Sequence, residues 1–143
     1  MTYFIATDHA GFSIKDHVKE FIRQKGHEVI DLGPASADRV DYPDYAHELC
    51  QKVLENRESA GILICGTGIG MSITANRHKG IRAALCHDAY TATLTRMHND
   101  ANVLCMGERV VGLGVVDSIL EAFLSTPFEG GRHACRIGKI EQE

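Results

Sequence analysis

Short apolar runs alternate with longer amphipathic stretches along the chain. Each run has four to six mostly apolar residues, which is the length of a buried strand. The five runs are Tyr3–Ala6, His27–Leu32, Gly61–Cys65, Ile81–Cys86 and Asn102–Met106. Strands that alternate with helices pair in parallel and carry helices on both faces. The pattern therefore predicts an α/β fold, a Rossmann-like three-layer α/β/α sandwich with a five-stranded parallel sheet.

The stretches between the runs have helical periodicity. Ile14, Val18, Phe21 and Ile22 share one helix face, which stops before Gly26. Further helices are predicted from Pro43 through Val53, from Ile69 to His78, from the N-cap residue Asp88 to Met97, and over residues 115–123. After Phe123 the pattern breaks, and we expect the short helical tail that follows to pack on a partner subunit.

Length and composition are those of one globular domain that spans residues 1–143. The formal net charge is -4, and no basic run could neutralise a line of phosphates, so we expect no nucleic-acid partner. Residues 1–7 lack the features of a signal peptide, and no apolar run approaches the ~20 residues of a membrane span. These observations predict a cytoplasmic protein without a membrane partner.

The five cysteines are widely spaced and include no Cys-x-x-Cys pair. An odd number in this arrangement disfavours both disulfides and a zinc knuckle, and suits a reducing compartment. Cys65 stands apart because it ends the third strand, just before a glycine-rich loop where a helix N-terminus can lower a thiol pKa. It is a candidate thiolate base, although position alone also fits a buried strand cysteine. Cys50, Cys86, Cys105 and Cys135 are predicted to be packing residues.

The loop Gly66-Thr67-Gly68-Ile69-Gly70 joins a strand to a helix, so its backbone N–H groups could converge on an anion. Met71 occupies the place of the last glycine of the dinucleotide fingerprint, and no Gly-Lys-Ser/Thr ending makes it a P-loop. A tight strand-to-helix turn without a ligand is the alternative.

Other polar groups lie near strand ends, and we expect them to gather at one edge of the sheet. Asp8 and His9 follow the first strand, and His98 with Asn99 precedes the fifth. A histidine can exchange protons at neutral pH, which makes His98 a candidate acid or base. The remaining histidines are predicted to be surface residues: His17, His27, His47, His78 and His87.

Three arginines are candidates for holding a phosphate. Arg132 and Arg136 stand four apart and share a face if the tail is helical, and Arg109 follows the fifth strand. A solvated surface pair is the alternative for the first two. Arginines so far apart in the sequence would need a dimer in order to meet.

Five motifs together resemble the type B ribose-5-phosphate isomerases, from the first strand to the tail. They are Asp8-His9-Ala10-Gly11-Phe12, Asp41-Tyr42-Pro43-Asp44-Tyr45-Ala46, Ile64-Cys65-Gly66-Thr67-Gly68-Ile69-Gly70, His98-Asn99-Asp100-Ala101-Asn102 and Glu129-Gly130-Gly131-Arg132-His133. The resemblance implies interconversion of ribose 5-phosphate and ribulose 5-phosphate, a pentose phosphate pathway reaction, without metal or organic cofactor. It also implies a homodimer, or a dimer of dimers, with the active site shared between subunits.

The resemblance implies a role for each motif. Cys65 transfers the proton between C2 and C1, while the amides of Gly66, Gly68, Ile69 and Gly70 hold the enediolate oxygen. His98 opens the sugar ring with help from Thr67. Asp8, Tyr42 and Asn99 contact substrate hydroxyls, and the phosphate is bound by His9, Arg132 and Arg136, with Arg109 acting from the partner chain.

Position 71 distinguishes two branches of that family. One branch lacks the cysteine and uses a glutamate where this chain has Met71, so Cys65 with Met71 indicates the cysteine branch. Three alternatives stay open at this point: an allose 6-phosphate or galactose 6-phosphate isomerase of the same family, a cysteine hydrolase built on Cys65 and His98, and a phosphate- or nucleotide-binding module without turnover.

Overall fold

The computed structural model describes residues 1–142, which form one sheet with helices around it. The strands are β1 (Thr2–Thr7), β2 (Glu28–Asp31), β3 (Ser59–Cys65), β4 (Ala83–Leu85) and β5 (Val103–Gly107). The helices are the 3-10 turn η1 (Phe12–Ile14), α1 (Lys15–Gln24), α2 (Tyr42–Glu55), α3 (Ile69–Ala75), α4 (Ala89–Asn99), α5 (Leu113–Ser125) and α6 (Arg132–Ile137). No helix in this part of the chain combines the length and apolar character needed to cross a lipid bilayer.

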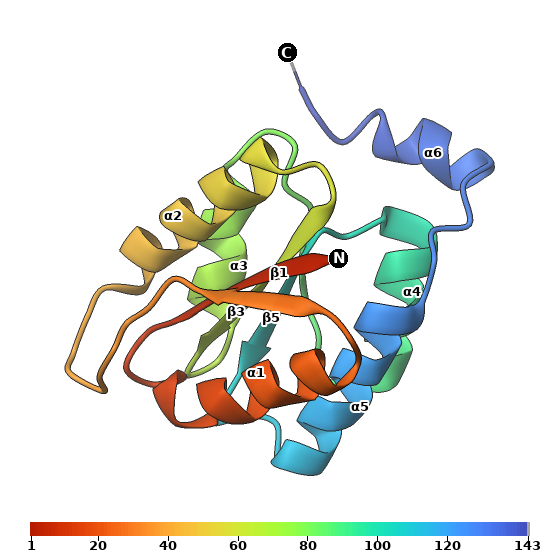
Figure 1. Cartoon of the computed structure of the whole chain (residues 1–143). Helices are drawn as coiled ribbons and strands as arrows, with labels where there is room; N and C mark the ends of the chain where they lie inside the picture. The colour runs from red at the N-terminus through yellow and green to blue at the C-terminus, as the bar shows by residue number, and fades with distance from the viewer. Residues whose placement is uncertain (143) are drawn as a thin grey trace.

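The sheet has the strand order β2-β1-β3-β5-β4, and every neighbouring pair is parallel (Figure 1). All seven residues of β3 are buried, as expected for a central strand covered on both faces. The five predicted strands and their parallel pairing are therefore confirmed.

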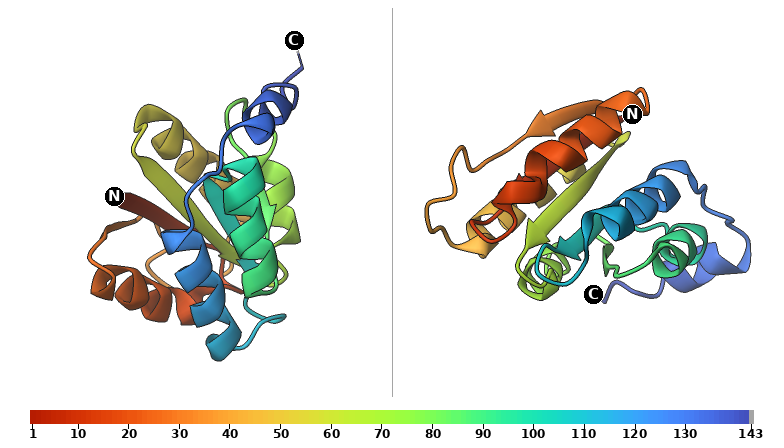
Figure 2. Two further views of the ribbon diagram at one scale, coloured as in Figure 1. Left: turned by 90° about the vertical axis from the view of Figure 1, so that its right-hand side faces the viewer. Right: turned by 90° about the horizontal axis from the view of Figure 1, so that it is seen from below.

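Two apolar clusters hold the helices against the sheet. On one face, Val18 and Ile22 of α1 pack with Val116 and Ile119 of α5, and α4 adds Ala92. On the other face, residues of α2 and α3 such as Leu49 pack against alternate positions of the strands. The two layers of helices are seen on either side of the sheet in Figure 2. Each long helix is thus amphipathic because it has one strand face to cover.

The third predicted helix is shorter than expected. It ends at Ala75 rather than His78, because the side-chain amide of Asn76 pairs with the backbone of Ala83, with an Nδ2···O distance of 2.9 Å and an Oδ1···N distance of 2.9 Å. Asn76 thereby takes the place of a neighbouring strand beside β4. That edge strand has three residues instead of the six predicted.

Other predicted boundaries are confirmed by local chemistry. Asp88 is the N-cap of α4, and its Oδ1 accepts a hydrogen bond from the amide of Thr91 at 2.7 Å. Gly26 follows α1 with a φ of +88°, the left-handed conformation that stops a helix. The tail folds as α6, which lies beside the end of α4 and away from the sheet (Figure 1).

The direction of the chain reverses between β1 and β3. From β1 the chain first moves outward to β2, and then returns to place β3 on the other side of β1. In parallel sheets this reversal leaves a crevice at the carboxyl ends of the two strands, where ligands bind. Asp8 and Cys65 stand at that position.

Candidate active site

Cys65 lies at the boundary between the apolar core and the glycine loop. Its residue is only 5% exposed and belongs to the cluster beneath α2 and α3. Its sulfur nevertheless accepts a hydrogen bond from the amide of Gly68, with an N···Sγ distance of 3.1 Å. The thiol therefore faces the loop rather than the centre of the core.

The glycine loop leads directly into α3. Gly68 is the N-cap and has a φ of +79°, and the Thr67 hydroxyl accepts from the amide of Ile69 at 3.2 Å. The amides of Gly70 and Met71 stand in the first helical turn, where N–H groups have no intrahelical partner. Tyr42, the first residue of α2, lies so close that a β-carbon at Gly70 would be 2.5 Å from its ring. The loop and Tyr42 thus form one surface.

Asp8 and His9 stand beside this loop. The carboxylate of Asp8 accepts the amides of Ala10 and Gly11, at 2.9 and 3.1 Å, and its own amide donates to the carbonyl of Ile64, the neighbour of Cys65. His9 accepts the amide of Val40 on Nδ1 at 3.3 Å, which leaves its Nε2 to carry a proton. Asp8, His9 and Tyr42 line a depression of about 500 Å³.

Arg109 lies on the same side as Cys65 in the same chain. Its amide donates to the carbonyl of Gly66 at 3.0 Å, and a β-carbon at Gly66 would be 3.4 Å from its guanidinium. We expected Arg109 to act from the partner chain, and within one chain the structure places it against its own glycine loop. Cys65 stands opposite Gly107 in the sheet, so the turn after β5 carries Arg109 over its own glycine loop.

His98 and Asn99 lie at the opposite edge of the sheet, contrary to the expectation of a single edge. They end α4, whose 11 residues span about 16 Å and run antiparallel to the strands. The following residue, Asp100, lines a cavity together with Met1 and Ser59, where β1 and β3 begin. A crossover helix has to return to the amino edge so that the next strand can start, which is why the prediction failed.

The tail is attached at this second edge. The amide of Glu129 donates to the carbonyl of Met97 at 3.1 Å, which ties the tail to the last turn of α4. Arg132 and Arg136 are exposed on α6. Within one chain the predicted site is therefore divided into two groups, one around Cys65 and one around His98.

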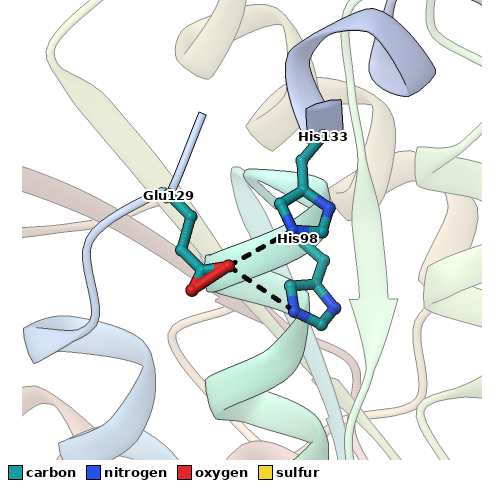
Figure 3. Close-up of side chains that lie close together, drawn as sticks. All are labelled: His98, Glu129 and His133. Carbon is teal, nitrogen blue, oxygen red and sulfur yellow. Dashed lines mark ion pairs between the residues drawn. The ribbon is translucent and has the colours of Figure 1, made fainter. Parts of the chain in front are cut away.

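Glu129 and His133 have no role predicted from the sequence, yet both lie against His98 (Figure 3). The His98 and His133 rings are stacked with their centroids 4.2 Å apart, and Glu129 Oε1 is 3.2 Å from His133 Nε2 and 3.8 Å from His98 Nε2. Burial, together with the charge of Arg132 and the neighbouring His98, lowers the pKa of His133. The sequence offered one signal for this contact, the four-residue spacing of Glu129 and His133.

Two other sets of residues differ in part from the sequence predictions. Cys50, Cys86 and Cys105 are buried as expected, and burial raises the pKa of Cys50 to about 12 and that of Cys86 to about 11. Cys135, however, is exposed and packs no core. Among the histidines expected at the surface, His78 is partly buried and hydrogen-bonded to His47, with an Nδ1···Nε2 distance of 2.7 Å.

Comparisons with known proteins agree with this arrangement. Ribose-5-phosphate isomerase B of Escherichia coli is 47% identical over 93% of this chain and 89% of its own length. A Bacillus subtilis relative is 52% identical over 98% of this chain and 95% of its own length, and its name specifies a sugar phosphate but not which one.

Solved structures are equally similar. Ribose-5-phosphate isomerase B of Clostridium thermocellum superimposes with a TM-score of 0.95, at 46% identity, covering 98% of this chain and 95% of that chain. The Thermotoga maritima enzyme gives a TM-score of 0.93 at 52% identity, covering 97% and 96%. The sequence model described as Ribose/Galactose Isomerase matches residues 3–140. The chain therefore belongs to the ribose/galactose isomerase family.

Proposed function

We propose that this protein interconverts ribose 5-phosphate and ribulose 5-phosphate, with Cys65 as the base that moves the proton. The observation that carries the proposal is the hydrogen bond from the Gly68 amide to the Cys65 sulfur, at 3.1 Å. It joins a nucleophilic atom to a loop of N–H donors at the sheet edge where parallel α/β proteins bind ligands. The names of the relatives support the same reaction.

The reaction needs one base and one set of donors. The Cys65 thiolate removes the proton from C2 of the open-chain aldose, and the electron pair of that bond forms a double bond between C1 and C2. The aldehyde oxygen then carries the negative charge, which the amides of Gly66, Gly68, Ile69 and Gly70 stabilise. Return of the proton to C1, and transfer of the O2 proton to O1, give the ketose.

Binding of the sugar falls to the groups beside the loop. Asp8 and Tyr42 contact hydroxyls, and His9 with Arg109 faces the phosphate from the same chain. Two hydrogen bonds already hold the Asp8 carboxylate, at 2.9 and 3.1 Å, so its orientation is set before substrate arrives.

The ring-opening group has to come from a second copy of the chain. His98, Asn99, Arg132 and Arg136 lie at the amino edge, and α4 alone separates the two edges by about 16 Å. A homodimer in which the tail and the end of α4 of one subunit cover the glycine loop of the other would complete the site. In that arrangement His98, assisted by Thr67, transfers the protons of ring opening.

The substrate assay tests the reaction directly. Purified protein is incubated with ribose 5-phosphate, allose 6-phosphate and galactose 6-phosphate, and formation of each ketose is measured. We expect the highest kcat/KM with ribose 5-phosphate. A clear preference for a hexose phosphate would identify an allose 6-phosphate or galactose 6-phosphate isomerase instead, and binding without ketose formation would leave only a binding module.

We also propose a cytoplasmic location. All five cysteines are free thiols, which suits a reducing compartment.

A further inference from the structure

Three potential metal ligands converge where the tail meets α4 (Figure 3). One nitrogen or oxygen atom from each of His98, Glu129 and His133 lies within 4.8 Å of the other two. His98 comes from the last turn of α4, His133 from α6, and Glu129 from the segment between α5 and α6. The backbone bond from the Glu129 amide to Met97 fixes that segment against α4. The cluster is thus assembled by tertiary structure.

His133 has a buried nitrogen that lacks a hydrogen-bond partner. Its side chain is 6% exposed, and its Nε2 makes no hydrogen bond within residues 1–142. Glu129 Oε1 is close, at 3.2 Å, but is not aligned to accept from the ring. A buried nitrogen without a partner is costly, and a bound cation would satisfy it.

We propose that His98, Glu129 and His133 bind a divalent transition-metal ion, with zinc as the best match. Two imidazoles and one carboxylate form a common zinc-ligand set, and a fourth position remains for water. Ligand atoms at about 2.0 to 2.1 Å around a tetrahedral ion are about 3.3 Å apart. The distance between His133 Nε2 and Glu129 Oε1 is already close to this spacing, at 3.2 Å.

His98 must move to complete the site. Its Nε2 is 3.8 Å from Glu129 Oε1, so it has to approach by about half an ångström to reach the ligand spacing of a tetrahedral ion. The two rings are nearly parallel, with an angle of 14° between them, whereas each nitrogen lone pair lies in its own ring plane. One ring therefore turns out of the stack when metal binds. The His98 side chain is 37% exposed within one chain, so no contact in that chain prevents this turn.

Metal at this position would inhibit the isomerase, and this consequence rests on the proposed function. A bound ion would occupy a ring nitrogen of His98, the residue to which the proposed function assigns ring opening. Zinc would then block ring opening of the sugar phosphate.

Calorimetric titration of the whole protein with zinc chloride tests the site itself. A background with Cys65→Ala and Cys135→Ser removes the proposed thiolate and the exposed thiol, and burial keeps Cys50 and Cys86 protonated by raising their pKa values to about 12 and about 11. We expect one ion per chain. Glu129→Gln and His133→Asn should each weaken binding more than ~10-fold, since loss of even outer-shell partners costs about 10- to 100-fold.

A matched control uses the other histidine pair. His47→Asn removes one ring of the His47–His78 pair, and zinc affinity should not change. Glu129 is 43% exposed, so Glu129→Gln keeps the fold even if His133→Asn does not. Absence of binding to the starting protein, or equal affinity in Glu129→Gln, would overturn the site. Cobalt chloride gives an independent readout, because a thiolate charge-transfer band would assign the metal to cysteine instead.

Activity measurements distinguish the proposed isomerase function from the proposed metal site. Ketose formation without added metal, in the presence of a chelator, tests the isomerase alone, while the calorimetric titration tests the metal site whether or not turnover occurs. If the metal-free protein turns over and added zinc inhibits it less in Glu129→Gln, the inhibitory role is supported. Equal inhibition in both proteins would overturn that role.

Discussion

The amide of Gly68 donates a hydrogen bond to the sulfur of Cys65, three residues earlier, at an N···S distance of 3.1 Å. This bond connects the end of the central strand to the N-terminus of α3, and it directs the thiol toward the glycine loop. Burial raises the pKa of two other thiols, Cys50 and Cys86, to about 12 and about 11.

Replacing Cys65 by alanine should abolish turnover and preserve binding. General-base catalysis contributes about 10²- to 10⁴-fold to the rate, so kcat should fall by about 10²-fold or more. Ribose 5-phosphate should still raise the melting temperature of the Cys65→Ala variant, because its other contacts remain. Cys135→Ala, at an exposed position of the tail, is the control. Retained turnover in Cys65→Ala would assign the base to another residue.

A side chain at Gly68 should destabilise the loop. Its φ of +79° costs an L-residue about 1 to 2 kcal/mol, and the new β-carbon would lie 2.6 Å from Leu85 and 2.8 Å from the Met106 backbone. Overpacking of this kind adds about 1 to 3 kcal/mol. Gly26→Ala is the matched control, because φ is +88° there but nothing lies within 4 Å. Urea unfolding should show a clearly larger loss for Gly68→Ala, and equal losses would contradict the packing argument.

The two halves of the site differ in how far sequence could predict them. Cys65, Thr67 and Asp8 were located correctly because the carboxyl ends of neighbouring parallel strands meet by topology alone. His98 was misplaced because closeness in sequence to a strand does not say at which edge a crossover helix ends. The stacking of His98 on His133 depends on how the tail folds back onto α4, and no periodic pattern encodes it.

Complementation between two inactive variants tests the shared site. Cys65→Ala and His98→Asn are mixed after partial unfolding so that subunits exchange. Random exchange makes half of the dimers mixed, each with one intact site, so activity should recover to about a quarter of wild type. If each chain used its own His98, every site would lack one group and no activity would return. Each variant refolded alone is the control.

Arg132→Ala should raise the Michaelis constant and change kcat little. A charge-assisted bond to phosphate contributes about 1.5 to 3 kcal/mol, which corresponds to a rise of about 10- to 100-fold. The exposed Arg132 makes no ion pair with another side chain within residues 1–142, so its loss should leave stability unchanged. Lys139→Ala removes a charge from the same tail and serves as control. An unchanged Michaelis constant would place the phosphate elsewhere.

Asp31 should make stability depend on acid pH. Burial alone would raise its pKa, but hydrogen bonds from Lys19, the Gly33 amide and Lys15 outweigh burial and lower the pKa. The Lys15 side chain is 3% exposed and bonds Asp31 at 3.2 Å, so Asp31→Asn leaves a buried cation without its carboxylate. Because Asp31 is itself 28% exposed, we expect a discounted loss of about 1 to 2 kcal/mol at neutral pH.

The sign of the pH effect follows from the lowered pKa of Asp31. The unfolded chain binds this proton more readily, so the contribution of Asp31 is complete above the ordinary aspartate pKa of about 3.9 and disappears as pH falls through the lower folded value. Urea unfolding at neutral and acid pH should therefore show the wild type and Asp31→Asn converging in acid. Asp16→Asn, at a 94% exposed carboxylate 3.7 Å from Lys19, should follow the wild type throughout. A constant difference between wild type and Asp31→Asn would mean that the stabilisation does not depend on the charge of Asp31.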